Sequence, residues 1–172
     1  ATGNTIGGTV VGDGNVIGGN LQDGVRIVDN SDDNRVQGNW IGTNSGGAEL
    51  GNVRHGVWVE GGALATSSPT LIRIGGIGAG EPNTIAFNDG GGVGCAGTAA
   101  PIFTSCIVWG NVGGSWVVSG ADSQPEVTFS CLETEEVWPG EGNINTDPLF
   151  CGFAGHAEVF VDGLDQPEGI AC

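Results

Sequence analysis

A short phrase of asparagine, glycine and β-branched residues recurs along the first half of this 172-residue chain. Its four copies are Gly3-Asn-Thr-Ile-Gly-Gly8, Gly14-Asn-Val-Ile-Gly-Gly19, Asn34-Arg-Val-Gln-Gly-Asn39 and Asn83-Thr-Ile-Ala-Phe-Asn88. Between them lie the companion phrases Gly24-Val-Arg-Ile27, Gly56-Val-Trp-Val59 and Gly92-Val-Gly-Cys95. Self-similarity at about one coil's length is typical of a solenoid. The sequence therefore predicts coils of two or three short strands, separated by Gly and Asn corners.

Stacked parallel strands give every backbone amide a partner in the coil above or below, so the predicted all-β fold is a parallel β-helix. Asparagine tolerates left-handed corner geometry, and like residues on successive coils can stack as hydrogen-bonded ladders. We expect these corner and ladder roles for Asn4, Asn15, Asn34 and Asn83. The 19 residues from Asn15 to Asn34 are interpreted as one complete coil with two strands.

The chain is expected to form one domain over residues 1–172, because no linker separates strands that must stack on each other. Residues 1–100 carry the Asn/Gly-cornered coils, and residues 101–172 are predicted to form broader terminal coils rich in Cys and Trp. Residues 40–55 are predicted to leave the coil as an inserted loop. The first residues already lie inside a repeat, so we expect either preceding chain or another copy to stack there.

The charge of the chain is strongly negative, with 4 Lys plus Arg against 20 Asp plus Glu and a formal net charge of −16. All four arginines lie before residue 100, and Lys, Tyr and Met are absent. Such a surface repels nucleic acid and anionic membranes, and no apolar run is long enough for membrane insertion. A polyanionic polysaccharide would need bridging divalent cations, so calcium is the one cofactor that we consider, without being required.

The five cysteines all lie in the second half of the chain, at positions 95, 106, 131, 151 and 172. Cys106 and Cys131 share a local context about one coil apart, which predicts a disulfide between neighbouring rungs. Cys151 with Cys172 is a second predicted pair, and the odd count leaves one thiol unpaired. Cysteine usage of this kind indicates an oxidising, secreted location.

The recurring phrases resemble those of right-handed parallel β-helix repeat proteins in the broad pectin-lyase-like group. In the second half, Cys106-Ile-Val-Trp-Gly-Asn111, Val127-Thr-Phe-Ser-Cys131 and Gly140-Glu-Gly-Asn-Ile-Asn-Thr-Asp-Pro-Leu-Phe150 look like the terminal coils of large secreted bacterial β-helix surface proteins. The resemblance covers nearly the whole chain. It implies a right-handed coil and an extracellular or cell-surface setting, and it carries over no catalytic residue.

Candidate sites for chemistry are few. Polysaccharide lyases on this scaffold need a base and a cation that neutralises a uronate carboxylate, and Arg54 with His55 is the one plausible pair. Trp40 and Trp58 would then line the groove as substrate-binding residues, although both could equally be core. The segment Asn145-Thr-Asp147 is only superficially similar to a polygalacturonase motif, because the paired aspartates are missing.

The corner Asp29-Asn-Ser-Asp-Asp33 gathers three carboxylates, Asp29, Asp32 and Asp33, that could hold Ca²⁺. An ordinary Asx-rich turn accounts for the same residues.

Two functions remain open from the sequence. The first is a secreted structural or adhesive β-helix module that self-associates through its ends, with end-to-end stacking into an extracellular filament. The alternative is a carbohydrate-active β-helix, either a polysaccharide lyase or hydrolase or a sugar-binding module. The sequence favours a structural protein over an enzyme.

Overall fold

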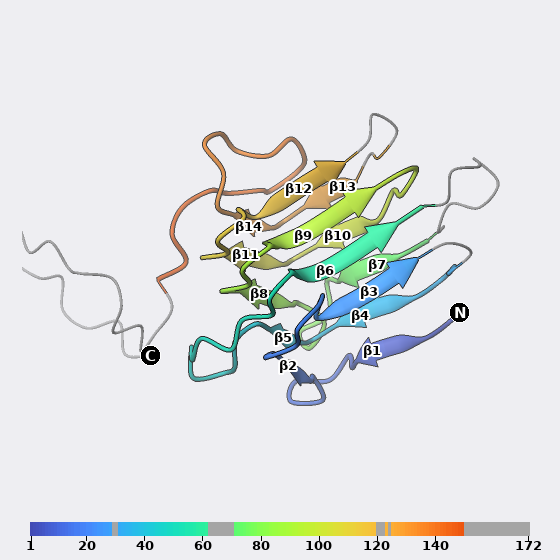
Figure 1. Cartoon of the computed structure of the whole chain (residues 1–172), viewed down its shortest axis with the longest axis horizontal. Coiled ribbons are helices and arrows are strands. Elements are labelled where there is room, and N and C mark those ends of the chain that lie inside the picture. Colours follow the sequence, from blue (N-terminus) through green and yellow to red (C-terminus); the bar gives the residue numbers. More distant parts are fainter. Residues whose placement is uncertain (29–30, 62–70, 120–122, 124, 150–172) are drawn as a thin grey trace, which may run out of the picture.

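The computed structural model describes residues 1–28, 31–61, 71–119, 123 and 125–149, and within them every regular element is a β-strand. Three strands make up each coil (Figure 1). The first three coils contain β1 (Thr5–Gly7), β2 (Val16–Ile17) and β3 (Val25–Val28), then β4 (Arg35–Gln37), β5 (Trp40–Ile41) and β6 (His55–Glu60), then β7 (Arg73–Gly75), β8 (Thr84–Ala86) and β9 (Gly91–Ala96). The remaining strands are β10 (Ile102–Thr104), β11 (Ile107–Trp109), β12 (Trp116–Ser119), β13 (Glu126–Thr128) and β14 (Cys131–Leu132).

These strands assemble into three parallel sheets, as expected of a parallel β-solenoid. Sheet A has the order β1-β4-β7-β10-β13, sheet B the order β14-β11-β8-β5-β2, and sheet C the order β12-β9-β6-β3. Each sheet takes every third strand of the chain, so neighbours in a sheet come from successive coils (Figure 1). No helix among the described residues is long and apolar enough to cross a membrane.

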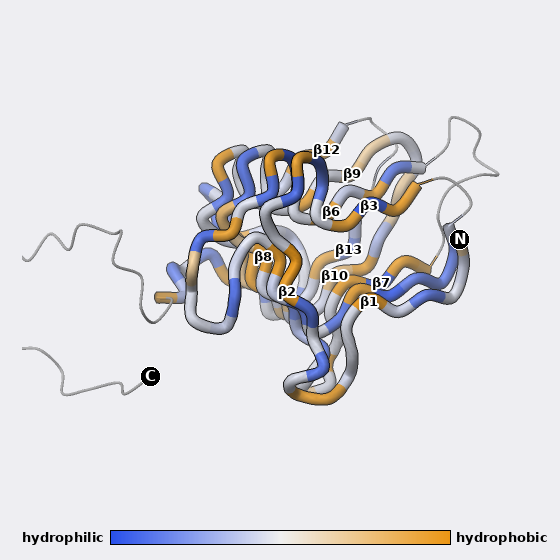
Figure 2. Tube along the Cα trace, turned by 60° about the horizontal axis from the view of Figure 1, so that its bottom comes forward, coloured by the Kyte–Doolittle hydropathy of each residue, from blue (hydrophilic) through white to orange (hydrophobic). Residues whose placement is uncertain are grey.

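The core lies between the three sheets, as the alternation of apolar residues predicts (Figure 2). On sheet A, the inward row is formed by Val36, Ile74, Phe103 and Val127, all nearly inaccessible to solvent. Sheets B and C add similar rows of Ile, Val and Leu to the same cluster. At the two ends the core is only partly covered, by Ile6 and Ile17 in the first coil and by Trp116 and Trp138 in the last coils.

Asparagine ladders run along the corners between the sheets. The A/B ladder contains Asn15, Asn39, Asn83, Cys106, Ser130 and Asn143; the B/C ladder contains Asn20, Asn52, Asn88 and Asn111; the C/A ladder contains Asn4 and Asn34. In each Asn–Asn step, the backbone N–H and the Nδ2 group of one coil both donate to the Oδ1 atom of the next. For Asn52 and Asn88 these distances are 3.1 and 2.7 Å. The ladder role predicted for Asn4, Asn15, Asn34 and Asn83 is thereby confirmed.

The interpretation of Asn15 to Asn34 as one coil is wrong. Asn15 bonds to Asn39 in the next coil, whereas Asn34 belongs to a different corner and bonds to Asn4. Steps along the ladders span between 13 and 44 residues, because loops of different length leave the corners. A fixed period could not be read from the sequence for this reason.

Coils after residue 100 continue the same three sheets. Cys106 and Ser130 are 24 residues apart, as are Asn15 and Asn39 in the first coils, against 44 for Asn39 and Asn83. Aromatic rings gather at this end, where the ring centroid of Trp116 lies 4.7 Å from that of Phe103 and 5.4 Å from that of Trp138. The aromatic residues therefore cover the end of the core.

Candidate functional site

The clearest cluster of charged and aromatic side chains lies on the outer face of sheet C. Asp23, just before β3, has a side chain that is 1% exposed, and its carboxylate binds three groups. Oδ1 accepts from the backbone N–H of His55 and lies 3.1 Å from His55 Nδ1, while Oδ2 lies 3.2 Å from a guanidinium nitrogen of Arg26. Arg26 also pairs with Glu60 at 3.0 Å. Paired and hydrogen-bonded in this way, the buried carboxylate is stabilised in place.

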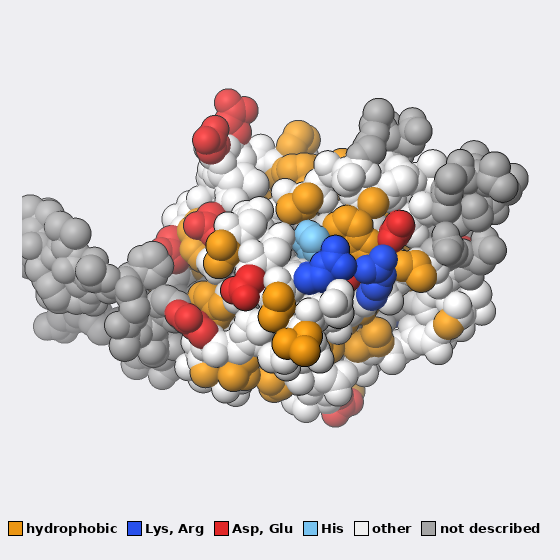
Figure 3. Space-filling view, viewed as in Figure 1, with side chains coloured by type: hydrophobic (Ala, Val, Ile, Leu, Met, Phe, Trp, Pro, Cys, Tyr) orange, Lys and Arg blue, Asp and Glu red, His pale blue; other side chains and the backbone are white. Residues whose placement is uncertain are grey.

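Trp58 lies beside this cluster on β6. Its Nε1–H group donates to Glu60 at 3.1 Å, and its ring centroid lies 4.6 Å from that of His55. The indole covers Gly94 of the next coil so closely that a Cβ atom there would lie 2.2 Å from the ring. Figure 3 shows the histidine between basic and hydrophobic side chains on this face. A flat, half-exposed aromatic surface with adjacent charges results.

Of the four residues predicted to line one groove, the structure brings three together and separates the fourth. Arg54 donates to Gln22 Oε1 at 3.2 Å and directly precedes His55, the first residue of β6, which also contains Trp58. Trp40 lies in β5 on sheet B, where it lines a small cavity with Val11 and Pro82 instead. The loop predicted over residues 40–55 is confirmed for residues 42–54, whereas Trp40 and Ile41 belong to β5 and His55 begins β6.

The sheet C cluster combines an oriented imidazole with an indole and two carboxylates. His55 is oriented by Asp23 on one side and by the indole on the other, and its side chain is 12% exposed. The carboxylates of this cluster, Asp23 and Glu60, are both bound to Arg26. The described part of the chain offers no paired free carboxylates for hydrolysis here.

The predicted disulfide between Cys106 and Cys131 is not formed, and both are free thiols, as is Cys95. The prediction aligned the two cysteines, but the register pairs Cys131 with Ile107 and places Cys106 opposite Ser130. Their sulfurs make separate contacts, Cys106 with the carbonyl of Ile74 at 3.5 Å and Cys131 with that of Thr146 at 3.2 Å. The other predicted pair, Cys151 with Cys172, lies outside the described residues.

Burial sets the protonation of these thiols. It raises the pKa of Cys95 to about 12 and that of Cys106 to about 11. Burial also raises the pKa of Cys131, with a smaller contribution from the Asp147 carboxylate. All three are therefore protonated and unreactive near neutral pH.

In the acidic corner proposed for calcium, Asp33 is paired with two arginines. Asp33 Oδ1 lies 3.2 Å from Arg73 and 3.7 Å from Arg35. Asp29 lies outside the described residues. Within the described ranges, no three His, Cys, Asp or Glu side chains converge as metal ligands.

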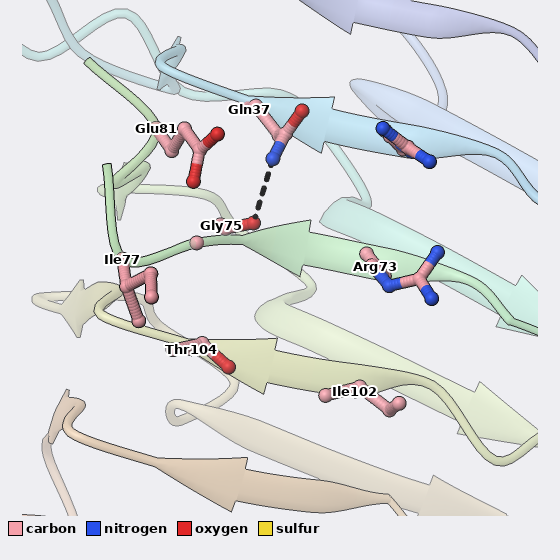
Figure 4. A pocket seen from close by; sticks show the side chains of 9 residues that line it. Gln37, Arg73, Gly75, Ile77, Glu81, Ile102 and Thr104 are labelled. Atoms are coloured by element: carbon pink, nitrogen blue, oxygen red, sulfur yellow. Dashed lines mark hydrogen bonds between the residues drawn. The ribbon is translucent and has the colours of Figure 1, made fainter. Parts of the chain in front are cut away.

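A cavity of about 330 Å³ opens on the outer face of sheet A (Figure 4). It lies between the row of Arg35, Arg73 and Ile102 and the row of Gln37, Gly75 and Thr104, with Ile77 and Glu81 from the following loop. The sequence analysis missed this cavity. The sequence did contain a signal for it. Val36 and Ile74 point inward, so the residues that flank each of them, Arg35 with Gln37 and Arg73 with Gly75, lie together on the outer face.

No family model, curated protein or solved structure matches the chain. The geometry described above is therefore the basis for the function proposed next.

Proposed function

We propose that this chain is a structural module of a secreted, right-handed parallel β-helix type, whose copies stack head to tail into an extracellular filament. The observation that carries the proposal is the first coil. Its strands β1, β2 and β3 are the edge strands of their sheets, and the Oδ1 atoms of Asn4, Asn15 and Asn20 have no donor among the described residues. Exposed strand edges readily pair with another chain.

The ladders give this end a polarity. Within the solenoid, each Asn Oδ1 accepts from the preceding coil, so a coil placed before the first one must supply donors. Asn143 holds the last described rung of the A/B ladder, and its Oδ1 atom already accepts from the N–H group of Ser130. Its own backbone N–H group would then donate to Asn15 of the following copy, while its Nδ2 group donates to the carbonyls of Val127 and Trp138. Such a contact is heterologous and does not close, which builds a filament.

The negative charge of the chain opposes this assembly, so filament formation should depend on the salt concentration. Each copy carries a formal net charge of −16, so copies repel one another at low ionic strength. At 0.15 M salt the screening length falls to about 8 Å, which weakens that repulsion. Calcium is proposed as an optional stiffener that bridges carboxylates of adjacent copies.

Negative-stain electron microscopy of the purified chain, with calcium and then with chelator, tests the proposal. We expect filaments at 0.15 M salt. Ile17→Glu, which places a charge on the open end, should abolish them, whereas Val112→Glu on a side face should not, because Val112 is 79% exposed. Monodisperse particles in all conditions, or equal effects of the two substitutions, would contradict head-to-tail stacking.

The convergence of Arg54, His55 and Trp58 on sheet C favours a second candidate, a sugar-binding face for an acidic polysaccharide. An indole offers an apolar ring face, and Arg54 supplies a cation that pairs with no carboxylate among the described residues. Affinity electrophoresis in gels that contain polyuronate should show retardation that Trp58→Ala removes and Trp40→Ala leaves unchanged. Release of unsaturated uronate or reducing sugar would instead assign an enzyme, and no retardation would exclude this candidate.

A further inference from the structure

The cavity on sheet A is lined in part by Gly75, which has no side chain. Gly75 lies between Gln37 and Thr104 in register, and the loop after it folds back to add Ile77 and Glu81 (Figure 4). The carboxylate of Glu81 accepts from the backbone N–H of Gly78 at 2.9 Å, which holds it at the cavity. The result is a hollow with a cationic side and an acceptor side.

The cationic side is an arginine pair. Arg35 and Arg73 are neighbours in register on adjacent strands, and Asp33 contacts one nitrogen of each. A guanidinium carries five N–H donors in a planar fork, so both side chains keep donors free for a second oxyanion. Two guanidinium groups share the Asp33 carboxylate on this side of the cavity, and Glu81 lies on the other side. A carboxylate is the group that the arginine pair fits.

The acceptor side contains an unsatisfied atom. The Gln37 side chain is 95% buried, since the residue is 5% exposed, and its Nε2 group donates to the carbonyl of Gly75 at 3.2 Å. Its Oε1 atom has no partner, and Figure 4 shows that atom turned away from Gly75. A buried acceptor left unpaired costs about 1–3 kcal/mol. Together with Glu81, it calls for a ligand that donates hydrogen bonds.

The separation of the two sides limits the ligand. Arg35 and Gln37 are two residues apart along β4, which separates their Cα atoms by about 6.6 Å at the rise of a β-strand. The charges of a free amino acid sit on one carbon and are too close to bridge that distance, whereas two residues of an extended peptide match it. Ile77, which is 87% exposed, and Ile102 offer aliphatic contact, and none of the described residues that line the cavity is aromatic.

We propose that this cavity binds the C-terminal residues of an extended peptide that ends in an aliphatic residue. The terminal carboxylate pairs with Arg35 and Arg73, and a backbone N–H group two residues' rise away donates to Gln37 Oε1 or Glu81. The peptide then runs antiparallel to β4 and β7. This inference is independent of filament formation and of the sheet C surface.

Fluorescence anisotropy with a fluorescein-labelled tetrapeptide ending in alanine-leucine tests the proposal on the full chain. Saturable binding is expected, weakened at least about tenfold when the terminal carboxylate is replaced by an amide, since an ion-paired hydrogen bond is worth at least that factor. The amide comparison uses the unaltered protein, so it does not depend on a variant folding. Arg73→Gln should weaken binding similarly, and Arg54→Gln, the same charge change on sheet C, should leave it unchanged.

Three results would overturn the assignment. They are the absence of saturable binding, equal binding of acid and amide, and equal weakening by the two arginine substitutions. Free leucine is expected not to compete. Competition by leucine as strong as that of the unlabelled peptide would assign an amino-acid site and refute the extended-peptide proposal.

Discussion

Most corners of the solenoid are built from two consecutive residues. The first has a left-handed backbone, and the second sends its side chain into a ladder; the residues before Asn15, Asn52 and Asn83 are exceptions, with no positive φ. Glycine supplies the first residue at many corners, as in Gly38 before Asn39, where φ is 73°. Phe87 and Ser105 take the same conformation at φ 62° and 55°. Because an L-residue in this region costs about 1–2 kcal/mol, the ladder bond that follows must outweigh the strain.

The Gly-Asn dipeptide was therefore a usable signal, and it led to the ladder roles of Asn4 and Asn15. The same signal could not find Cys106 or Ser130, where a thiol and a hydroxyl replace the amide. Similar neighbouring residues made Cys106 and Cys131 look equivalent. A one-residue difference in register, which only the pairing of β11 with β14 fixes, separates them.

Alkaline pH should destabilise the fold through Cys106. Burial raises the pKa of this thiol from 9.0 to about 11, so between these values the unfolded state loses the proton that the folded state keeps. The stabilising contribution is complete below pH 9 and is lost as pH rises to about 11, with a slope of up to about 1.4 kcal/mol per pH unit. Urea unfolding at pH 8 to 11 measures it.

Cys106→Ser is the matched variant, because a serine hydroxyl already fills the next ladder position at Ser130. The chain contains no Lys or Tyr that would titrate in the same range. We expect a shallower decline for the variant. Identical slopes for both proteins would show that Cys106 does not titrate differently on folding.

At the scale of elements, the side-chain ladders connect strands that are too short to be stable through their own backbone hydrogen bonds. Several strands contain only two or three residues, such as β2 and β5. Asn88, at the corner after β8, donates to the carbonyls of Ile41 and Ala86 and to Asn111 Oδ1. It also accepts two hydrogen bonds from Asn52. One buried side chain thus connects three successive coils.

Asn88→Ala should cost about 3 kcal/mol or more, because it leaves several buried donors and acceptors unpaired. Asn20→Ala, at the exposed start of the same ladder, should cost less than about 1 kcal/mol, since water replaces its partner. Chemical denaturation of both variants measures the difference. Equal losses would mean that ladder position does not matter.

The alternation of Val and Ile with polar residues was enough to predict the strands and their inward faces. Coil length was not predictable, because loops between strands vary. Residues after Ile41 form a loop in which Thr43 Oγ1 donates to the carbonyl of Ala48 and the Asn44 side chain accepts from Gly46 and Ala48. Loops closed by their own hydrogen bonds can change length without changing the sheets.

Across the whole molecule, the three candidate sites lie on different parts of the solenoid. Sheet C carries the His55 and Trp58 surface, sheet A carries the cavity of Arg35 and Arg73, and the first coil carries the open edges. The sequence could indicate Arg54, His55 and Trp58 as candidates. It could not show that Trp40 belongs to another sheet, because that depends on where each corner turns.

The head-to-tail ladder is tested most directly by cryo-electron microscopy of the assembled chain at 0.15 M salt. We predict filaments in which all copies point in one direction and the rung spacing of about 4.8 Å continues unbroken from Asn143 of one copy to Asn15 of the next. Copies that alternate in direction, or a junction wider than one rung, would contradict the stacking. So would particles that stay single at every salt concentration.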